Sequence, residues 1–181
     1  MAERLALPGK ILALDDALGP IPHAFGGALA LAYYAEPRAT VDIDVNVFAP
    51  EAEAAGALDA LRPLGIAVDR RAVKAATTDG QVRVYWDDNP VDLFFSYDRF
   101  HDAAERAVVR VPFSDTVIPI LAADHLVVCK VVFNRPQDWV DIDAIRQAGT
   151  ALDPAEILRW VARIVGDEDA RYERIVAVLA T

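Results

Sequence analysis

The chain contains little cysteine and histidine, and this scarcity excludes several kinds of site. Cys129 is the only cysteine, so no intrachain disulfide can form, and its valine and leucine neighbours predict a core residue. The three histidines, His23, His101 and His125, lack the spacing of a zinc site, so no zinc is predicted. No serine or cysteine has a recognisable catalytic partner, so neither is predicted to act as a nucleophile.

The sequence also lacks any segment with the composition of a membrane span or a secretory signal. A bilayer span needs about 20 consecutive apolar residues, and the longest candidate, Leu126 to Phe133, is interrupted by Lys130. The first residues, Met1 to Leu5, include a charge pair where the hydrophobic core of a signal peptide would begin. With a single cysteine, these features predict a cytoplasmic protein that does not bind membranes.

Length and composition predict one folded domain, or a core with a small helical appendage. The chain has 181 residues, 54% of them hydrophobic, and its proline and glycine are scattered, so no long linker is expected. The formal net charge is −10, which argues against a broad basic surface that binds nucleic acid non-specifically. A metal-bound nucleotide remains compatible with this charge, because the local charge in a cleft can oppose the overall sign.

Hydrophobic periodicity predicts an α/β amino-terminal part. The clearest strand covers residues 40–48, where Asp42, Asp44 and Asn46 alternate with apolar residues. Two more strands, over about 82–86 and 91–96, flank Asp87-Asp88-Asn89-Pro90, which is typical of a hairpin turn. The remaining predictions are helices over about 3–18, 28–36 and 53–64, and short strands over 22–25, 108–111 and 117–121.

The pattern changes to helical from Ala122 onward. Helices are predicted over about 122–133, 136–148 and 169–179, and another opens at Asp153, where an acid, a proline and a glutamate form a good start signal. We therefore predict an α/β core over residues 1–121 and a helical carboxy-terminal part over residues 122–181. The one local basic cluster is predicted to be a solvated loop, with contact to an acceptor RNA or protein as the alternative: Arg70, Arg71 and Lys74.

Three aspartates are candidate ligands of a divalent metal ion. Asp42 and Asp44 would point to the same face of their strand, about 7 Å apart along the chain. Two such carboxylates repel each other unless a cation lies between them, and Mg²⁺ binds one or two carboxylates together with phosphate oxygens and water. Asp92 interrupts an apolar run, and a third carboxylate beside the pair would allow two metal ions. The alternatives are a solvent-facing strand for the pair and an ion-paired acid at a sheet edge for Asp92.

Two further features are candidates for contact with phosphate. Gly26 and Gly27 lie at a predicted junction of strand and helix, where glycine allows close backbone approach and N–H groups can bind phosphate; a simple turn is the alternative. Lys130, one of three lysines, interrupts an apolar helix, so its charge must reach water, pair, or serve a site. Pairing of Lys130 with Asp138 or Asp141 is the structural alternative. A salt-bridge network is the favoured interpretation of Arg135, Asp138 and Asp141.

In this order, the motifs resemble the nucleotidyltransferase superfamily. The segment that follows the two glycines reads Ala28-Leu29-Ala30-Leu31 and leads into Arg38-x-Thr40-x-Asp42-Ile43-Asp44. A later stretch contains Ala123-Asp124-His125-Leu126, Lys130 and Arg135-x-x-Asp138-x-x-Asp141-Ile142. This stretch is similar to the helical signature of the AbiEii-like branch, the toxin halves of abortive-infection toxin–antitoxin modules. The resemblance covers about residues 22–146.

The resemblance implies a nucleotidyltransferase fold, with a mixed sheet and a helical carboxy-terminal part, and it implies a role for each candidate residue. Gly26 and Gly27 would meet the nucleotide phosphates, and Asp42 and Asp44 would bind metal. Asp92 would be the third metal-binding carboxylate and would align or deprotonate the acceptor hydroxyl. Lys130 would neutralise triphosphate charge. Arg38 and Thr40 would brace the metal-binding strand or line the rim of the pocket.

We therefore expect an enzyme that uses Mg²⁺ or Mn²⁺ to transfer a nucleoside monophosphate from a nucleoside triphosphate to a hydroxyl group, with release of pyrophosphate. The acceptor would be RNA, a protein or a small molecule. The resemblance also implies a toxin with a cognate antitoxin as partner. Two alternatives stay open: a non-catalytic module that binds nucleotide or protein on the same fold, and an antitoxin-like nucleotidyltransferase that modifies a protein.

Overall fold

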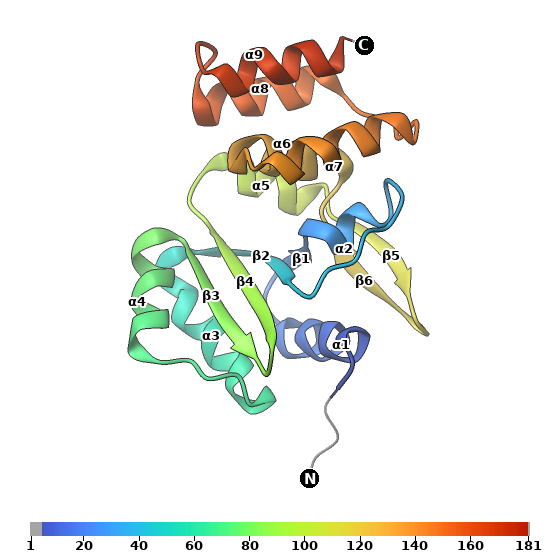
Figure 1. The fold of residues 1–181 in the computed structure, drawn as a ribbon. Coiled ribbons are helices and arrows are strands. Elements are labelled where there is room, and N and C mark those ends of the chain that lie inside the picture. The colour runs from blue at the N-terminus through green and yellow to red at the C-terminus, as the bar shows by residue number, and fades with distance from the viewer. Residues whose placement is uncertain (1–4, 181) are drawn as a thin grey trace.

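A computed structural model describes residues 5–180 of the chain. Its strands are β1 (His23–Phe25), β2 (Ile43–Pro50), β3 (Gln81–Trp86), β4 (Asn89–Ser96), β5 (Val109–Phe113) and β6 (Thr116–Ile120). They form one six-stranded sheet in the order β3-β4-β2-β1-β6-β5 (Figure 1). β2 runs parallel to β4 and β1 runs parallel to β6, while the other neighbours are antiparallel. The sheet is therefore mixed, which confirms the predicted fold class.

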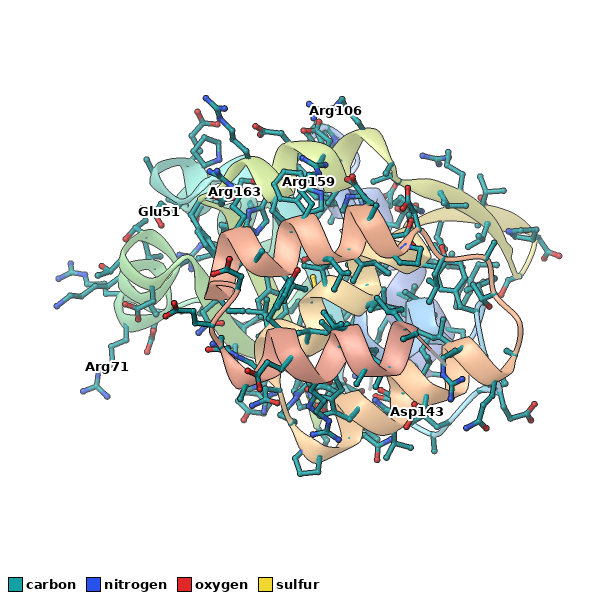
Figure 2. The ribbon with its side chains drawn as sticks, turned by 90° about the horizontal axis from the view of Figure 1, so that it is seen from above. Glu51, Arg71, Arg106, Asp143, Arg159 and Arg163 are labelled. Atoms are coloured by element: carbon teal, nitrogen blue, oxygen red, sulfur yellow. The ribbon has the colours of Figure 1, made fainter. Side chains whose placement is uncertain are left out.

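Helices lie on both sides of this sheet. The first group is α1 (Leu7–Leu18), α2 (Gly27–Leu31), α3 (Ala54–Leu61), α4 (Arg70–Asp79) and α5 (Arg99–Arg106). The second group is α6 (Ala123–Phe133), α7 (Pro136–Gln147), α8 (Pro154–Val165) and α9 (Ala170–Leu179). In Figure 1, α1 and α3 lie below the sheet and the second group lies above it, with α8 and α9 outermost. Figure 2 views the molecule from that upper side. The division of the chain at residue 121 stays a prediction.

Burial alternates along the strands, and this alternation separates a core face from an open face. In β3 the valines and Trp86 are buried while Gln81, Arg83 and Tyr85 are exposed. In β4 every second residue from Val91 is buried, and Asp92 is only partly buried. Because neighbouring side chains of a strand point to opposite faces, the polar residues of β3 and β4 share the open face, where they are free to form a site.

The hairpin of β3 and β4 is fixed to the rest of the molecule through its turn. Lys10 of α1 is buried, and its Nζ donates hydrogen bonds to Trp86 O at 2.9 Å, Asp87 Oδ2 at 2.8 Å and Asn89 Oδ1 at 2.9 Å. The Asn89 side chain in turn donates to Val41 O at 2.9 Å. These bonds anchor the predicted hairpin both to α1 and to the segment that carries Asp42.

Most predicted elements are confirmed, with shifted ends. The strand predicted over 40–48 begins at Ile43, because the Thr40 side chain accepts a hydrogen bond from the Asp42 N–H at 3.1 Å and holds this segment in a turn. The helix predicted from about residue 3 begins at Leu7, with Pro8 in its first turn; the part of that prediction that falls on residues 3 and 4 lies outside the described residues.

Two helices were not predicted, and the prediction of a solvated loop around Arg70 was wrong. Those residues form α4, which begins where the Asp69 side chain accepts a hydrogen bond from the Ala72 N–H at 2.7 Å. α5 begins similarly at Asp98, whose side chain accepts from the Phe100 N–H at 2.9 Å. In both places the capping aspartate is a local signal for the start of a helix, whereas the apolar periodicity did not indicate a helix. Within residues 5–180, no helix combines the length and the apolar character needed to cross a bilayer.

Candidate active site

Strand pairing brings the predicted carboxylates together on the open face of the sheet. Asp44 of β2 and Asp92 of β4 are direct partners in the parallel register. Asp42 precedes β2, and its Oδ2 lies 3.8 Å from Nη2 of Arg83, the residue that faces Asp92 from β3. Neighbouring strands are about 4.8 Å apart, so all three carboxylates lie around one small region of the sheet.

Arg83 forms a close ion pair at this position. Its Nε and Nη2 donate to the two Asp92 carboxylate oxygens at 2.7 and 2.6 Å. The Asp92 side chain is 15% exposed, and its hydrogen bonds raise the pKa of Arg83. Asp92 is therefore ion-paired, as the alternative predicted, but the predicted sheet edge was wrong because β4 lies between β3 and β2. Arg83 was not among the predicted site residues, although the two-residue turn of the hairpin predicts that it faces Asp92.

The Asp44 carboxyl group has a strongly raised pKa. Burial raises its pKa to about 6, and the nearby negative charge of Asp92 acts in the same direction. The positive charges of Arg135 and Lys130 oppose this shift without cancelling it. A buried carboxyl group that carries excess negative charge in its surroundings attracts a cation, and perturbed groups of this kind cluster at functional sites.

The two glycines pack directly against Asp44. The Gly26 N–H donates to Asp44 O at 2.9 Å, and Gly27 has a φ of +52°. A Cβ atom on Gly27 would lie 1.8 Å from Asp44 Oδ2, and one on Gly26 would lie 2.9 Å from Asn46 Nδ2. Close approach of the backbone to the carboxylate therefore requires glycine at position 27. Contact of Gly26 and Gly27 with phosphate stays a prediction.

Gly27→Ala is expected to destabilise the protein and to disturb the site. A left-handed backbone conformation strains a residue with a Cβ by roughly 1–3 kcal/mol, and the new methyl group must also displace the Asp44 carboxylate. Thermal unfolding should show a clear loss of stability. Gly56→Ala in α3 is the control, because its Cβ would meet nothing within 4 Å and alanine favours a helix by about 0.5–1 kcal/mol. Equal melting temperatures for Gly27→Ala and the unmodified chain would contradict this account.

Lys130 lies at the centre of a buried salt-bridge network. It is 3% exposed, and its Nζ is 2.6 Å from Asp141 Oδ2 and 3.8 Å from Asp138 Oδ1. Arg38 donates two hydrogen bonds of 3.0 Å to Asp141, and Arg135 pairs with Asp138 at 2.8 Å. The predicted structural network is therefore confirmed, and Arg38 braces the segment before β2 against α7.

Lys130 also lines a small cavity. This cavity has a volume of about 30 Å³ and is bordered as well by Gly27 and Asp44. The ammonium group of Lys130 is already bonded to Asp141. Neutralisation of a triphosphate by Lys130 stays a prediction.

A wide cleft adjoins two of the three carboxylates, Asp44 and Asp92. It has a volume of about 600 Å³, and its floor includes Asp44, Arg83 and Asp92. One wall is α4, including Arg71, whose side chain projects from that helix away from the rest of the molecule (Figure 2). The opposite wall includes Phe133 and Arg135, near the junction of α6 and α7. This volume lies within the range of roughly 300–1,000 Å³ that small-molecule sites occupy.

The donor atoms fit a divalent metal ion that is shared with a nucleotide. Among residues 5–180, no group of three or more histidine, cysteine, aspartate or glutamate side chains is arranged to hold a metal ion by itself. Mg²⁺ commonly binds only one or two carboxylates and completes its shell with phosphate oxygens and water. The hard oxygens of Asp42, Asp44 and Asp92, around a buried Asp44 with a raised pKa, suit such a shared site. Their role as metal ligands stays a prediction.

Comparison with known proteins gives one family match. A family model described as "Nucleotidyl transferase AbiEii toxin, Type IV TA system" matches residues 12–179. A search of curated proteins found no match.

Solved structures with similar folds include two of the antibiotic-resistance factor ANT(2″)-Ia. Its solution structure has a TM-score of 0.56 at 17% identity and covers 94% of this chain and 92% of that chain. Its crystal structure with adenylyl-2″-tobramycin has a TM-score of 0.50 at 15% identity and covers 94% and 93%. The lincosamide antibiotic adenylyltransferase LnuA matches with a TM-score of 0.49 at 12% identity and covers 77% and 94%. At these identities, the ANT(2″)-Ia likeness shows a shared fold.

Proposed function

The chain belongs to the AbiEii nucleotidyltransferase family, and we propose that it transfers a nucleoside monophosphate from a nucleoside triphosphate to a hydroxyl acceptor. The observation that carries this proposal is the register pairing of Asp44 with Asp92 beside the Gly27 backbone. This pairing concentrates acidic oxygens at one point on the floor of an open cleft. In such a cleft both a nucleotide and an acceptor can approach the same atoms.

In the proposed reaction, the acceptor oxygen attacks the α-phosphorus of the nucleotide. A new bond forms between that oxygen and phosphorus, the bond to the β-phosphate oxygen breaks, and pyrophosphate leaves. Asp92 aligns the acceptor hydroxyl and accepts its proton, which requires Arg83 to release at least one carboxylate oxygen. Asp42 and Asp44 hold the divalent ion, and Gly26 and Gly27 face the phosphates. When bound, Mg²⁺ or Mn²⁺ supplies positive charge to the leaving pyrophosphate.

We further propose a toxin role in the cytoplasm, with a cognate antitoxin as partner. The description of the matching family supports this proposal. The acceptor is RNA, a protein or a small molecule, and labelled transfer from the preferred nucleotide distinguishes the three. A volume of about 600 Å³ for the open cleft is compatible with a small molecule. The net charge of −10 weighs against a long RNA contact outside the cleft.

Binding of the four ribonucleoside triphosphates tests the proposal. Titration calorimetry with and without Mg²⁺ should show metal-dependent binding for the unmodified chain and its loss for Asp44→Asn. Asp59→Asn in α3 is the matched control, because the Asp59 side chain is 65% exposed and should bind normally. If the unmodified chain binds none of the four nucleotides with Mg²⁺, or if Asp44→Asn binds as tightly, the assignment of this site is wrong.

A further inference from the structure

Asn46 is a buried carboxamide that the proposed reaction does not use. It lies on β2, two residues beyond Asp44 on the same face of the sheet, and it is 8% exposed. Within residues 5–180 its side-chain amide makes no hydrogen bond. Burial of an unpaired amide is unfavourable. The Asn46 amide borders two cavities beside the candidate site, so it is free to form hydrogen bonds with a ligand there.

The cavity above Asn46 has room for one ring system. Its volume is about 170 Å³, below the roughly 300 Å³ at which sites for larger ligands begin, so it does not admit a whole nucleotide. Phe94 and Asn46 lie on its sheet side, and Cys129 and Phe133 border it from α6. Burial raises the pKa of Cys129 to about 12, so this thiol stays uncharged. The cavity thus combines apolar walls with the amide of Asn46, and Asp79, Gln81, Tyr97 and His101 also line it.

The same residues connect this cavity to the phosphate side of the site. Asn46, Phe94, Cys129 and Phe133 also border the small cavity that includes Gly27 and Asp44. Phe94 and Phe133, whose ring centroids are 5.3 Å apart, further border the wide cleft beside Asp92. The aromatic pair therefore lies between the open cleft, where the proposed acceptor approaches Asp92, and an inner space that adjoins the small cavity beside Gly27.

We infer that this inner cavity takes the base of the nucleoside triphosphate and that Asn46 determines which base is preferred. The inference rests on the proposed function. A carboxamide offers an acceptor and two donors in one plane, the pattern that pairs with a base edge carrying a donor beside an acceptor, as in adenine. Phe94 and Phe133 offer aromatic faces for stacking. The base rather than the acceptor fits here, because the cavity shares Asn46 and Phe94 with the small cavity beside Gly27, which is proposed to face the phosphates of the same nucleotide.

The experiment measures Mg²⁺-dependent binding of ATP, GTP, CTP and UTP, and of inorganic tripolyphosphate, which has no base. The variants are Asn46→Leu, Asn46→Ala and the control Gln147→Leu, which changes an exposed amide on α7. In Asn46→Leu the preferred nucleotide should bind about tenfold or more weakly, so that the four affinities converge. Tripolyphosphate should bind within about twofold of its original affinity. Melting temperatures show that each variant is folded, and loss of folding in one Asn46 variant leaves the other as the test.

The possible outcomes separate the inference from the function on which it rests. If the unmodified chain binds the four nucleotides equally, or if Asn46→Leu leaves their ranking unchanged while Asp44→Asn abolishes binding, the inference is overturned and the proposed function stands. An equal loss for the nucleotides and tripolyphosphate would show that Asn46 acts on the phosphates. Weaker binding of the acceptor, with nucleotide binding unchanged, would assign the cavity to the acceptor. Failure of the unmodified chain to bind any nucleotide would remove both proposals.

Discussion

Asp44→Asn is expected to abolish nucleotidyl transfer and, at the same time, to stabilise the ligand-free protein at neutral pH. Loss of one charge-stabilising group lowers kcat by roughly 10²–10³-fold, and the loss here should be at least that large because Asp44 is a proposed metal ligand. The gain in stability follows from its pKa of about 6, raised mainly by burial. The rise of the Asp44 pKa from 3.8 to about 6 corresponds to roughly 3 kcal/mol of lost stability at neutral pH. Asparagine avoids this loss because it carries no charge.

The size of this stabilisation depends on pH. Folded Asp44 binds its proton more tightly than unfolded Asp44, so the folded state loses stability as pH rises from about 4 to about 6. Asp44→Asn should therefore melt higher than the unmodified chain at pH 7, by roughly 2–4 °C for each kcal/mol, and the difference should shrink toward pH 4. Asp59→Asn, exposed on α3, should show neither change. A lower melting temperature for Asp44→Asn at pH 7 would contradict the burial of an ionised carboxylate here.

Lys130→Met is expected to destabilise the protein strongly. Removal of one partner from a buried ion pair costs about 3–5 kcal/mol, because the buried carboxylate that remains has lost a charge partner. Asp141 keeps its bonds to Arg38 and Gln137, so we expect a value near the lower end. Urea unfolding measures the change. Lys74→Met on the exposed side of α4 is the control and should stay within about 0.5 kcal/mol of the unmodified chain.

The same variant distinguishes a structural role of Lys130 from contact with triphosphate. If the network with Asp141 is its main role, the double variant Lys130→Met with Asp141→Asn should recover part of the lost stability, because the buried Asp141 carboxylate that lost its Lys130 partner is then absent. If Lys130 instead acts mainly on the nucleotide, the ligand-free variant should unfold normally and only the affinity for triphosphate should fall. The second result would contradict a stability role for the 2.6 Å contact.

The strand that follows Asp42 and its partner were predictable because their signals are local. Alternation at residues 41–48 places Asp42 and Asp44 on one face, and the turn at Asp87–Asp88 identifies the strand that carries Asp92. The direct pairing of Asp44 with Asp92 is set by the parallel contact of β2 with β4, which joins segments about fifty residues apart. No local pattern encodes that register. The sequence therefore predicted three converging carboxylates only on the condition that the two strands are neighbours.

The walls of the cleft were harder to predict for a different reason. α4 contains several arginine, lysine and threonine side chains, and its polar composition resembles a solvated loop until the capping role of Asp69 is recognised. Asn46 was noticed only as one polar position in an alternating strand. Its burial and its lack of a partner depend on α6, which covers the sheet and follows β2 by more than seventy residues.

The Arg83–Asp92 contact also affects the order in which ligands can enter. A free divalent ion that approaches Asp92 meets a carboxylate already neutralised by a guanidinium group 2.6 Å away, so its binding is an exchange of one cation for another. A nucleotide that carries its own metal ion changes this balance, because its phosphates offer the displaced arginine a new anionic partner. If Asp92 contributes to the proposed metal site, we therefore expect the site to bind a metal–nucleotide complex more tightly than the free metal ion.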